Sequence, residues 1–399
     1  MCLFRKSKGE SAMNKKLILL ITVLMVVAAG CIIYVPSDTG ERPPSDEGYY
    51  GDRYDDRSGM DWDTSRVYDY LSPYGNWVRY QAYGYVWIPT VNRYDWRPYT
   101  DGRWVWSDYG WTWVSSYRWG WIPFHYGRWG FDARLGWYWV PGDVWAPAWV
   151  SWRSSQLYIG WAPIPPGVPF IPGRGVVFDG RTIPYRHWVF LQSPYFMRQS
   201  IYSYVLPYER NLTIINLTVH KTSLYMRNNR MYNDGLDIGF VESVSKTRIQ
   251  KYELQQGRTA GPSRIEGDRV TVYNPRVTKD DSARPGRILT EREAEVQQEE
   301  QRSGKVKILG EAEIERRQRE EVEKIETSQE REVVEMKKKM ERETATTSSR
   351  VEKTRITQEY EDKIKTLKES HATEKKDVEV RHQEEKTKVV KKKVVKKDA

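Results

Sequence analysis

Tryptophan is concentrated in one segment of this 399-residue chain, because sixteen of its eighteen tryptophans lie between Trp77 and Trp161. They recur with Tyr, Gly and Pro, and Trp96-Arg97-Pro98 aligns with Trp121-Ile122-Pro123 at an offset of 25 residues. A repeat of this length is typical of a supersecondary unit that must pack on its neighbours to bury its apolar face. This segment therefore constrains the fold more than any other part of the chain.

Aromatic residues in this segment follow a period of two. The pattern is seen in three pairs of tryptophans: Trp104 and Trp106, Trp111 and Trp113, and Trp137 and Trp139. Residues two apart share one face of a β-strand. Turn-forming residues separate the paired runs at 81–84, 107–110 and 132–136. We therefore expect three β-hairpins and a weaker fourth over 148–161, with prolines in the connections between them.

The N-terminal region has the features of an export segment. Lys15-Lys16 precede an apolar run from Leu17 to Val35, which favours a targeting segment over a core helix. Within that run, Ala28-Ala29-Gly30-Cys31 resembles a bacterial lipobox, so Cys31 is the candidate lipidation site. The alternative is an uncleaved membrane helix, for which about 20 apolar residues suffice. Both interpretations place the rest of the chain outside the cytoplasm.

Shifts in composition predict the fold class and its parts. We expect a mainly β N-terminal module of repeated antiparallel hairpins, a small α+β unit and a long charged α-helix with the potential to form a coiled coil. The expected boundaries are 1–35 for the signal or anchor, 36–66 for a disordered tether, 67–167 for the hairpins, 168–284 for the α+β unit, 285–386 for the helical segment and 387–399 for a basic tail. In the α+β unit, strands are expected over 211–226, 248–254 and 264–273, and a helix over 237–245.

The charged segment has clear helix signals. Thr290 and Glu293 have capping-box spacing, and no Gly or Pro occurs from Glu311 to Lys386. A continuous helix of this length would extend about 110 Å. Its apolar residues recur every eleven residues, which indicates a nearly straight seam. The stretch from Thr344 to Ser349 also permits a helical hairpin, so a single helix, a self-associating helix and a hairpin all remain open.

Aromatic rings of the repeat are the main candidates for ligand binding, because Trp and Tyr faces stack on sugars and cations. The candidate stacking residues are Trp104, Trp111, Tyr126, Trp129 and Trp137. The competing interpretation is core packing, because only Cys2 and Cys31 are present and the exported part has no disulfide to stabilise it. Lysines of the tail are candidates for binding an anionic surface: Lys391, Lys392, Lys393, Lys396 and Lys397.

Motifs of catalysis and metal binding are not found in the sequence. There is no Gly-rich phosphate loop, no G-x-S-x-G motif and no H-E-x-x-H motif, and the five histidines lack metal-ligand spacing. We therefore expect no enzyme activity, no catalytic residues, no cofactor and no metal. The net charge of +10 favours anionic partners, but nucleic acid is not expected for an exported chain.

Several motifs resemble those of a known family. Pro73-Tyr74-Gly75-Asn76-Trp77, Tyr83-Gly84-Tyr85-Val86-Trp87 and Gly136-Trp137-Tyr138-Trp139 resemble a family of uncharacterised Gram-negative envelope proteins with aromatic Tyr-Gly-x-Trp repeats, over about residues 67–280. The resemblance implies an exported repeat protein of unknown activity and carries over no catalytic residue. A looser similarity to the choline-binding cell-wall repeats of Gram-positive bacteria implies that such hairpins can bind envelope polymers.

These observations lead to one main functional expectation. The chain is expected to be a non-catalytic cell-envelope lipoprotein with a structural or adaptor role, in contact with the membrane through Cys31 or the N-terminal helix, and self-associating through its C-terminal helix. Ile32 is not an acidic retention residue, which favours the outer membrane facing the periplasm; the alternative is an inner-membrane single-span anchor. Alternative functions are a glycan- or peptidoglycan-binding module and, more remotely, an enzyme acting on an envelope polymer.

Overall fold

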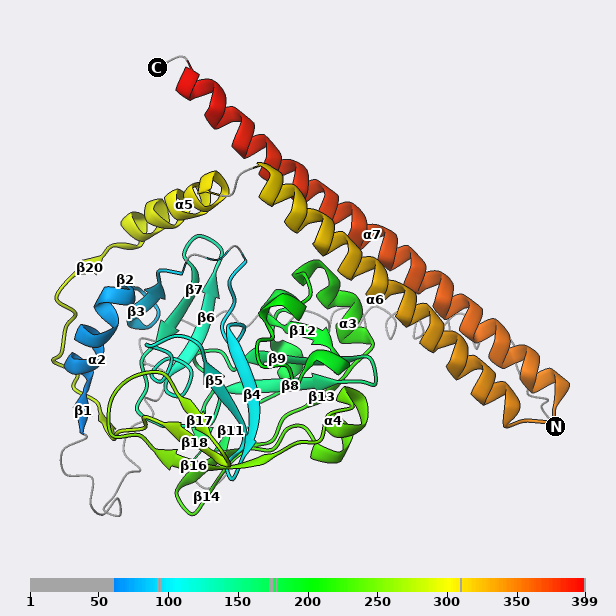
Figure 1. Ribbon diagram of the computed structural model, residues 1–399, viewed down its shortest axis with the longest axis horizontal. Helices are drawn as coiled ribbons and strands as arrows, with labels where there is room; N and C mark the ends of the chain where they lie inside the picture. Colours follow the sequence, from blue (N-terminus) through cyan, green and yellow to red (C-terminus); the bar gives the residue numbers. More distant parts are fainter. Residues whose placement is uncertain are drawn as a thin grey trace, which may run out of the picture. The chain divides into compact units, whose positions relative to one another are not determined.

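The computed structural model describes residues 61–397, except for 92, 94, 172–174, 177, 309 and 310, and the side chains of 302–308, 311–312 and 388–397 (Figure 1). These residues belong to one compact unit, Asp46–Ala399. The expected signal segment with Cys31 and the tether up to residue 60 lie outside the described residues. Within the described part, no helix has both the length and the apolar character needed to cross a bilayer.

Four antiparallel hairpins make up the tryptophan-rich segment, as the period-two pattern predicts. They consist of β2 (Gly75–Tyr80) with β3 (Gly84–Pro89), β4 (Gly102–Ser107) with β5 (Gly110–Ser115), β6 (Arg128–Asp132) with β7 (Gly136–Val140), and β8 (Val150–Ser154) with β9 (Tyr158–Pro163). The first three turns each end on a glycine with φ near +80°, namely Gly84, Gly110 and Gly136. Only glycine adopts this conformation without a steric penalty from Cβ. The turn chemistry therefore sets the hairpin registers.

Tryptophan pairs face each other across every hairpin. The pairs are Trp77 with Trp87, Trp104 with Trp113, Trp106 with Trp111, Trp129 with Trp139, and Trp152 with Trp161. Most of these rings are buried in a single apolar cluster. Many of their indole N–H groups donate to backbone carbonyls outside the hairpins; Trp77, for example, donates to Tyr68 of helix α2 (Thr64–Leu71) and Trp161 to Tyr99. The repeated tryptophans thus fill the core and also hold the loops against it.

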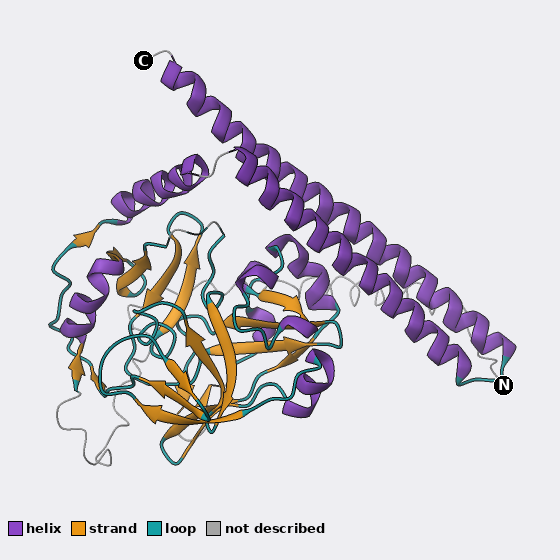
Figure 2. Cartoon of the chain, viewed as in Figure 1, coloured by secondary structure: helices purple, strands orange, loops and turns teal. Residues whose placement is uncertain are grey.

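The hairpins are distributed over three sheets around this core (Figure 2). The first and third hairpins share a five-stranded sheet of order β20-β2-β3-β7-β6, with β20 at Ile288–Leu289. The second hairpin lies in a seven-stranded sheet of order β14-β15-β5-β4-β16-β18-β17, and the fourth in a four-stranded sheet of order β12-β9-β8-β13. Because hairpins adjacent in sequence enter different sheets, the repeat closes around one core instead of forming a linear stack.

Strands from residues 168–284 complete the sheets of the hairpins instead of forming a separate α+β unit. These strands are β12 (Val189–Gln192), β13 (Val219–Lys221), β14 (Leu224–Arg227), β15 (Arg230–Asn233), β16 (Lys251–Gln256), β17 (Arg264–Glu266) and β18 (Arg269–Val272). Two small sheets pair β10 (Phe170–Ile171) with β11 (Gly175–Val176) and β1 (Trp62–Asp63) with β19 (Val277–Thr278). We call residues 61–289 the β module.

Some expected elements of the β module are confirmed and two are corrected. The helix expected over 237–245 is α4 (Ile238–Ser245), capped by Asp237, and the strands expected at 248–254 and 264–273 are present. The start of the expected strand region 211–226 is instead helix α3 (Asn211–Asn216), because its apolar residues pack as one turn against Trp188 and Phe190. The end of the expected tether is ordered as β1 and helix α2 (Thr64–Leu71), whose Val67, Tyr68 and Leu71 enter the core.

Three helices follow the β module: α5 (Glu291–Ile308), α6 (Glu311–Ala345) and α7 (Arg350–Lys397). The predicted capping box is confirmed, because Thr290 N donates to Glu293 Oε2 at 2.7 Å and Glu293 N donates to Thr290 Oγ1 at 3.2 Å. The predicted helix restart near Glu311 is also confirmed. The chain reverses between α6 and α7, and these two helices pack side by side (Figure 1). Of the arrangements that the sequence leaves open, the structure has the helical hairpin.

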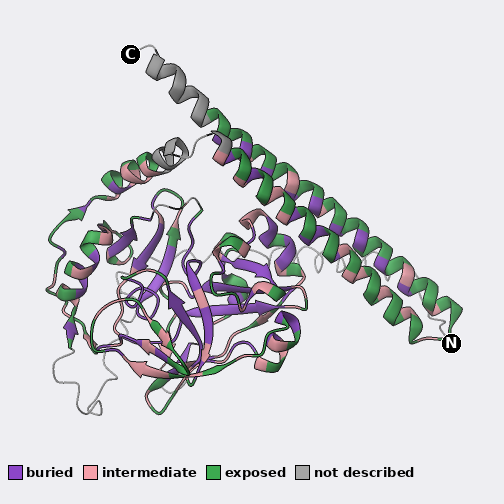
Figure 3. Cartoon of the chain, in the orientation of Figure 1, coloured by how far each residue is buried: buried purple, intermediate pink, exposed green. Residues whose placement is uncertain are grey.

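Polar layers repeat along the helical hairpin at the same eleven-residue spacing as its apolar residues. Gln318 of α6 donates to Glu385 of α7, and Glu321 bonds His382. Eleven residues later in α6 and eleven residues earlier in the antiparallel α7, the same pair types recur as Gln329 with Glu374 and Glu332 with His371. Ile325 and Val378 are buried between the two layers, and further buried apolar residues lie on either side of them: Ile314, Ile356, Tyr360, Ile364 and Leu367. Figure 3 shows buried positions recurring along both helices, whose outer faces are exposed. The repeat therefore sets the register of the helical hairpin.

Candidate functional site

One buried arginine of the β module joins both helices of the helical hairpin. Arg210 lies in a single helical turn, Tyr208–Arg210, and has no exposed surface. Its guanidinium donates to the carboxylates of Glu332 on α6 and Glu374 on α7. Tyr158 of β9 donates its hydroxyl to the same Glu332 carboxylate. We call this group, together with His371, the Arg210 cluster; it links the β module to α6 and α7 at one point.

Charges in the Arg210 cluster compensate each other. Burial alone lowers the pKa of Arg210, but the attraction of Glu332 and Glu374 outweighs it and leaves the pKa above its usual value. Burial and the nearby Glu332 raise the pKa of Tyr158 far above its usual range, so its hydroxyl remains a donor. Nε2 of His371 lies 2.5 Å from Glu332 Oε2. Arg210 thus faces two carboxylates, and the ring of His371 lies against one of them.

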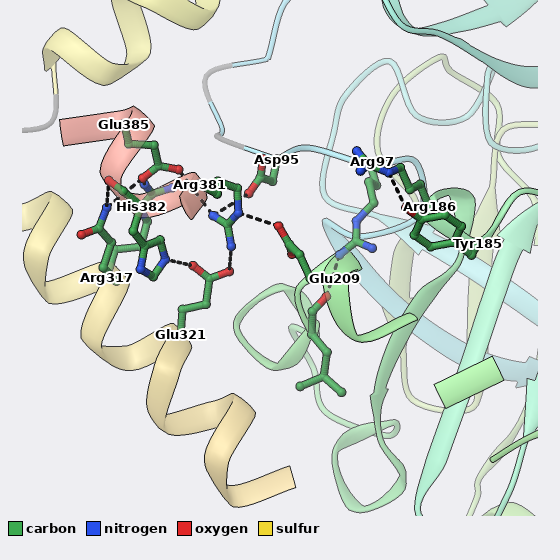
Figure 4. Close-up of polar contacts among 12 residues, drawn as sticks. Asp95, Arg97, Tyr185, Arg186, Glu209, Arg317, Glu321, Arg381, His382 and Glu385 are labelled. Carbon is green, nitrogen blue, oxygen red and sulfur yellow. Dashed lines mark hydrogen bonds and ion pairs between the residues drawn. The ribbon is translucent and has the colours of Figure 1, made fainter. Parts of the chain in front are cut away.

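In a second junction the helical hairpin supplies the arginine and the β module supplies a carboxylate (Figure 4). Arg381 of α7 donates to Glu209 of the β module at 2.7 Å and to Glu321 of α6 at 2.6 Å. Burial lowers the pKa of Arg381, but Glu321 and Glu209 more than offset that effect and raise it. His382 bonds the other Glu321 oxygen at 2.8 Å. We call these residues the Arg381 cluster.

The two junctions meet at consecutive residues, because Glu209 accepts from α7 while Arg210 donates to α6 and α7. Removing one partner of a buried ion pair leaves an uncompensated charge and costs about 3–5 kcal/mol. Arg331 of α6 also donates to Gln192 of β12. The attachment of the helical hairpin is therefore specific in position and sensitive to single substitutions.

Beside the Arg381 cluster lies a groove with a volume of about 390 Å³, which is within the range of small-ligand sites. One wall comes from the β module and includes Trp96, Phe131 and Trp137. The other comes from α5 and α7 and includes Gln298, Arg381 and Glu384. Arg97 and Arg186 line it on the side of the β module (Figure 4). The groove is thus shared between the β module and the helices.

Aromatic rings gather at one part of the groove. Phe131 and Trp137 contact each other edge to face, with ring centroids 5.4 Å apart, and both contact His187. Phe131 is 41% exposed, although it belongs to a strand of the tryptophan-rich segment. Burial lowers the pKa of His187 to about 4, so its ring is neutral at pH 7. The groove therefore offers an apolar aromatic platform next to charged side chains.

Residues 68–168 match the sequence model of a family of unknown function, DUF6600. The DUF6600 match begins in α2, covers all four hairpins and ends just after β9. No curated protein matches the chain, and no solved structure matches it. The aromatic wall of the groove lies inside the DUF6600 match, whereas Arg210, Glu209 and all three C-terminal helices lie outside it.

The prediction that these aromatic rings stack on a ligand is wrong for four of the five residues, because the four are buried. Trp104, Trp111, Trp129 and Tyr126 are at most 2% exposed. The polar atoms of three of them are used internally: Trp111 donates to Leu236, Trp129 to Pro123 and Tyr126 to Pro275. These four rings are core residues, as the competing interpretation holds, because the sheets close over them on both sides. Trp137 alone among the five lines the groove.

The remaining predicted site residues are not tested by the structure. Cys31 lies outside the described residues. The candidate lysines of the tail belong to the last turns of α7, whose side chains are not described: Lys391, Lys392, Lys393, Lys396 and Lys397. Both the lipidation site and the anionic-surface site therefore stay predictions.

One pair of residues resembles part of a nucleophile–base arrangement. Ser151 Oγ lies 2.7 Å from Nε2 of His220. Ser151 is fully buried, and the nearby Asp179 directs its carboxylate to Arg181. The hydroxyl thus has no access to a substrate, and a hydrogen bond to Thr222 accounts for its other contact. Within the described residues, no three His, Cys, Asp or Glu side chains are arranged to hold a metal ion.

Sequence reasoning missed the polar residues of the helical hairpin. His371 and His382 are eleven residues apart, as are Gln318 and Gln329, so the spacing noted for the apolar residues extends to their polar neighbours. That signal could have predicted the layers. No sequence signal marks Arg210, because its carboxylate partners lie more than 120 residues away along the chain.

Proposed function

We propose that this chain is a non-catalytic cell-envelope lipoprotein with a structural or adaptor role. The observation that carries the proposal is the pair of opposed ion-pair junctions at Glu209 and Arg210, which attach a helical hairpin to the β module in one defined position. Such an attachment suits a rigid carrier that presents its helices to a partner or to a second copy. Anchoring through Cys31 rests on the lipobox-like sequence, and placement at the outer membrane rests on Ile32, which is not an acidic retention residue.

The anchor is tested by metabolic labelling with a lipid precursor in cells that produce the native chain or Cys31→Ala, followed by membrane fractionation. Incorporation and processing are expected in the native chain and are lost in Cys31→Ala. An unlabelled, unprocessed native chain that stays in the membrane would contradict lipidation and support the single-span anchor. The adaptor role is tested by cross-linking in the envelope, where partners captured by the native chain should be lost when the helical hairpin is released by Arg210→Met.

A second candidate function is glycan binding, and the groove is the observation that favours it. Phe131 exposes much of its ring beside Trp137, next to several arginines and carboxylates. Aromatic faces pack against sugar C–H groups, while charged side chains bond hydroxyls. Retention of the native chain on insoluble envelope glycan, and its loss in Phe131→Ala, would support this function. Equal recovery with and without glycan would argue against it.

A further inference from the structure

Charged side chains in the groove balance in sign. The arginines that line it are Arg93, Arg97, Arg186 and Arg381. The carboxylates that line it are Asp95, Glu299, Glu384 and Glu385. These four arginines and four carboxyl groups balance in formal charge, although the whole chain carries +10. Burial raises the pKa of Asp95 to about 7, so this carboxyl group is partly protonated at pH 7. An acidic polymer would meet carboxylates at close range, and like charges in one site are unfavourable.

Most of the arginines are already engaged, which lowers their attraction for an anion. Arg97 donates to the carbonyls of Trp188 and Leu206, both at 2.9 Å. Arg93 pairs with Asp101 at 3.0 Å. Arg186 lies over the ring of Tyr208, 4.7 Å from its centroid. The groove therefore presents donors and acceptors side by side, an arrangement that suits a ligand whose hydroxyls both donate and accept.

Apolar surface completes this match. The exposed ring of Phe131 lies on the wall of the β module, beside Trp137, which is only 8% exposed. The ring of Phe131 can cover the apolar face of a sugar ring. On the opposite wall, Gln298 and Gln301 of α5 and Glu384 of α7 add neutral amides and a carboxylate. A neutral sugar has both surfaces, because C–H groups line its faces and hydroxyls line its edge.

We infer that this groove binds a neutral oligosaccharide and that its occupancy holds α7 against the β module. The inference rests on the glycan-binding candidate above and names its site and ligand class. A ligand that contacts both walls is bound only when α7 is docked, so binding must stabilise the docked state by linkage. Arg381 lines the groove and also forms the junction with Glu209. This residue therefore couples ligand binding in the groove to the docking of α7.

The test uses the full chain and a soluble β-1,4-linked N-acetylglucosamine tetramer as the probe. Binding is measured by calorimetry for the native chain, for Phe131→Ala and for the matched control Leu212→Ala, which removes an exposed apolar side chain outside the groove lining. We expect Phe131→Ala to weaken binding at least tenfold and Leu212→Ala to bind like the native chain. An oligogalacturonate of the same length should bind at least tenfold more weakly than the tetramer.

Coupling is measured by hydrogen exchange of α6 and α7 amides with and without saturating tetramer, and the tetramer should slow exchange in both helices. Tight binding without slowed exchange would overturn the coupling. Equal binding by Phe131→Ala and the native chain would overturn the assignment to the groove while leaving glycan binding intact. Preference for the oligogalacturonate would overturn the neutral-ligand class. A native chain that neither binds the tetramer nor is retained on insoluble glycan would reject glycan binding itself.

Discussion

His125 shows how burial decides what a single side chain does. Its ring is stacked on Trp145 at a centroid distance of 5.6 Å, and its Nδ1 lies 3.0 Å from the carbonyl oxygen of Ala146. Burial of the ring lowers the pKa of His125 to about 4. A histidine with so low a pKa is a neutral packing residue and not a general base at pH 7.

This burial predicts acid sensitivity. Because the folded-state pKa lies below the unfolded value of about 6.5, the neutral ring contributes stability above pH 6.5 that is lost as the pH falls toward 4. The native chain should therefore lose about 3 kcal/mol from this residue over that interval. Urea denaturation at pH 7 and pH 4 should show a smaller loss for His125→Gln than for the native chain. Equal losses would show that folding does not lower the pKa of His125.

Two glycines allow conformational strain to be separated from steric overlap. Gly110 and Gly267 both have positive φ, at 83° and 60°. A Cβ on Gly110 would lie 2.2 Å from the carbonyl oxygen of Asn233, whereas one on Gly267 would meet nothing within 4 Å. At Gly110, the neighbouring strand β15 leaves no room for a Cβ atom. At Gly267, only the positive φ of the turn favours glycine.

The corresponding variants should differ in the free energy of unfolding. Gly267→Ala introduces the left-handed conformation alone and should cost about 1 kcal/mol. Gly110→Ala adds an overlap with backbone that cannot move away, and should cost at least about 3 kcal/mol. Thermal unfolding of both variants beside the native chain provides the comparison. Similar losses would mean that β15 shifts to accommodate the new methyl group.

At the scale of elements, the phase of the helical seam explains why α6 and α7 form a hairpin. Met336 and Ile356 lie on the seams of their helices, twenty residues apart. At 100° per residue, an uninterrupted helix would place them about 200° apart, on opposite faces. A continuous rod could not present both seams to one partner helix, whereas a reversal at 346–349 pairs them directly.

Attachment of this helical hairpin should depend on Arg210. Arg210→Met leaves Glu332 and Glu374 buried without their guanidinium, and should destabilise docking by about 3–5 kcal/mol. Arg355→Met is the matched control, because Arg355 pairs with Glu352 and Glu359 on an exposed helix face, where ion pairs contribute little. Amide exchange in α6 and α7 should quicken in Arg210→Met only. Equal acceleration in both variants would mean that the helical hairpin is held by its own surface pairs.

At the scale of the whole molecule, apolar packing and charge pairing hold different parts together. Among the described residues, none of the five buried apolar clusters includes a side chain of α6 or α7. The tryptophan core is closed within the β module, by the sheets together with α2 and α4, and Ala294 of α5 belongs to a smaller cluster. The β module should therefore fold without the helical hairpin, while the hairpin depends on the β module for its position.

A chain that ends after Ile308 tests this division. It retains every residue of the five clusters, so it should keep a cooperative thermal transition and the near-UV circular dichroism of its packed tryptophans. Its Arg210 loses both carboxylate partners but gains access to water, which limits the penalty. Loss of the cooperative transition would show that the helical hairpin is needed for the core to form.

Local patterns in the sequence determined much of this architecture. Alternating tryptophans and turn glycines predicted the hairpins, because side chains two apart share a strand face and a positive φ requires glycine. The capping box at Thr290 and the break at Thr344–Ser349 marked helix ends, because these signals also depend only on residues close together in the sequence. For the site, the sequence pointed to Trp137 among five aromatic candidates, but alternation alone could not tell a buried face from an exposed one.

Tertiary structure alone decided which sheet each hairpin entered, that α3 is a helix, and where charged residues meet. Arg210 reaches Glu332 and Glu374 only because the chain folds α6 and α7 back onto the β module, and the groove exists only because α5 and α7 form its second wall. A periodic sequence pattern predicts the conformation of a single helix or strand, because the pattern repeats with the period of that element's backbone. Contacts between residues far apart in sequence depend on how many elements pack at once, and no local pattern contains that information.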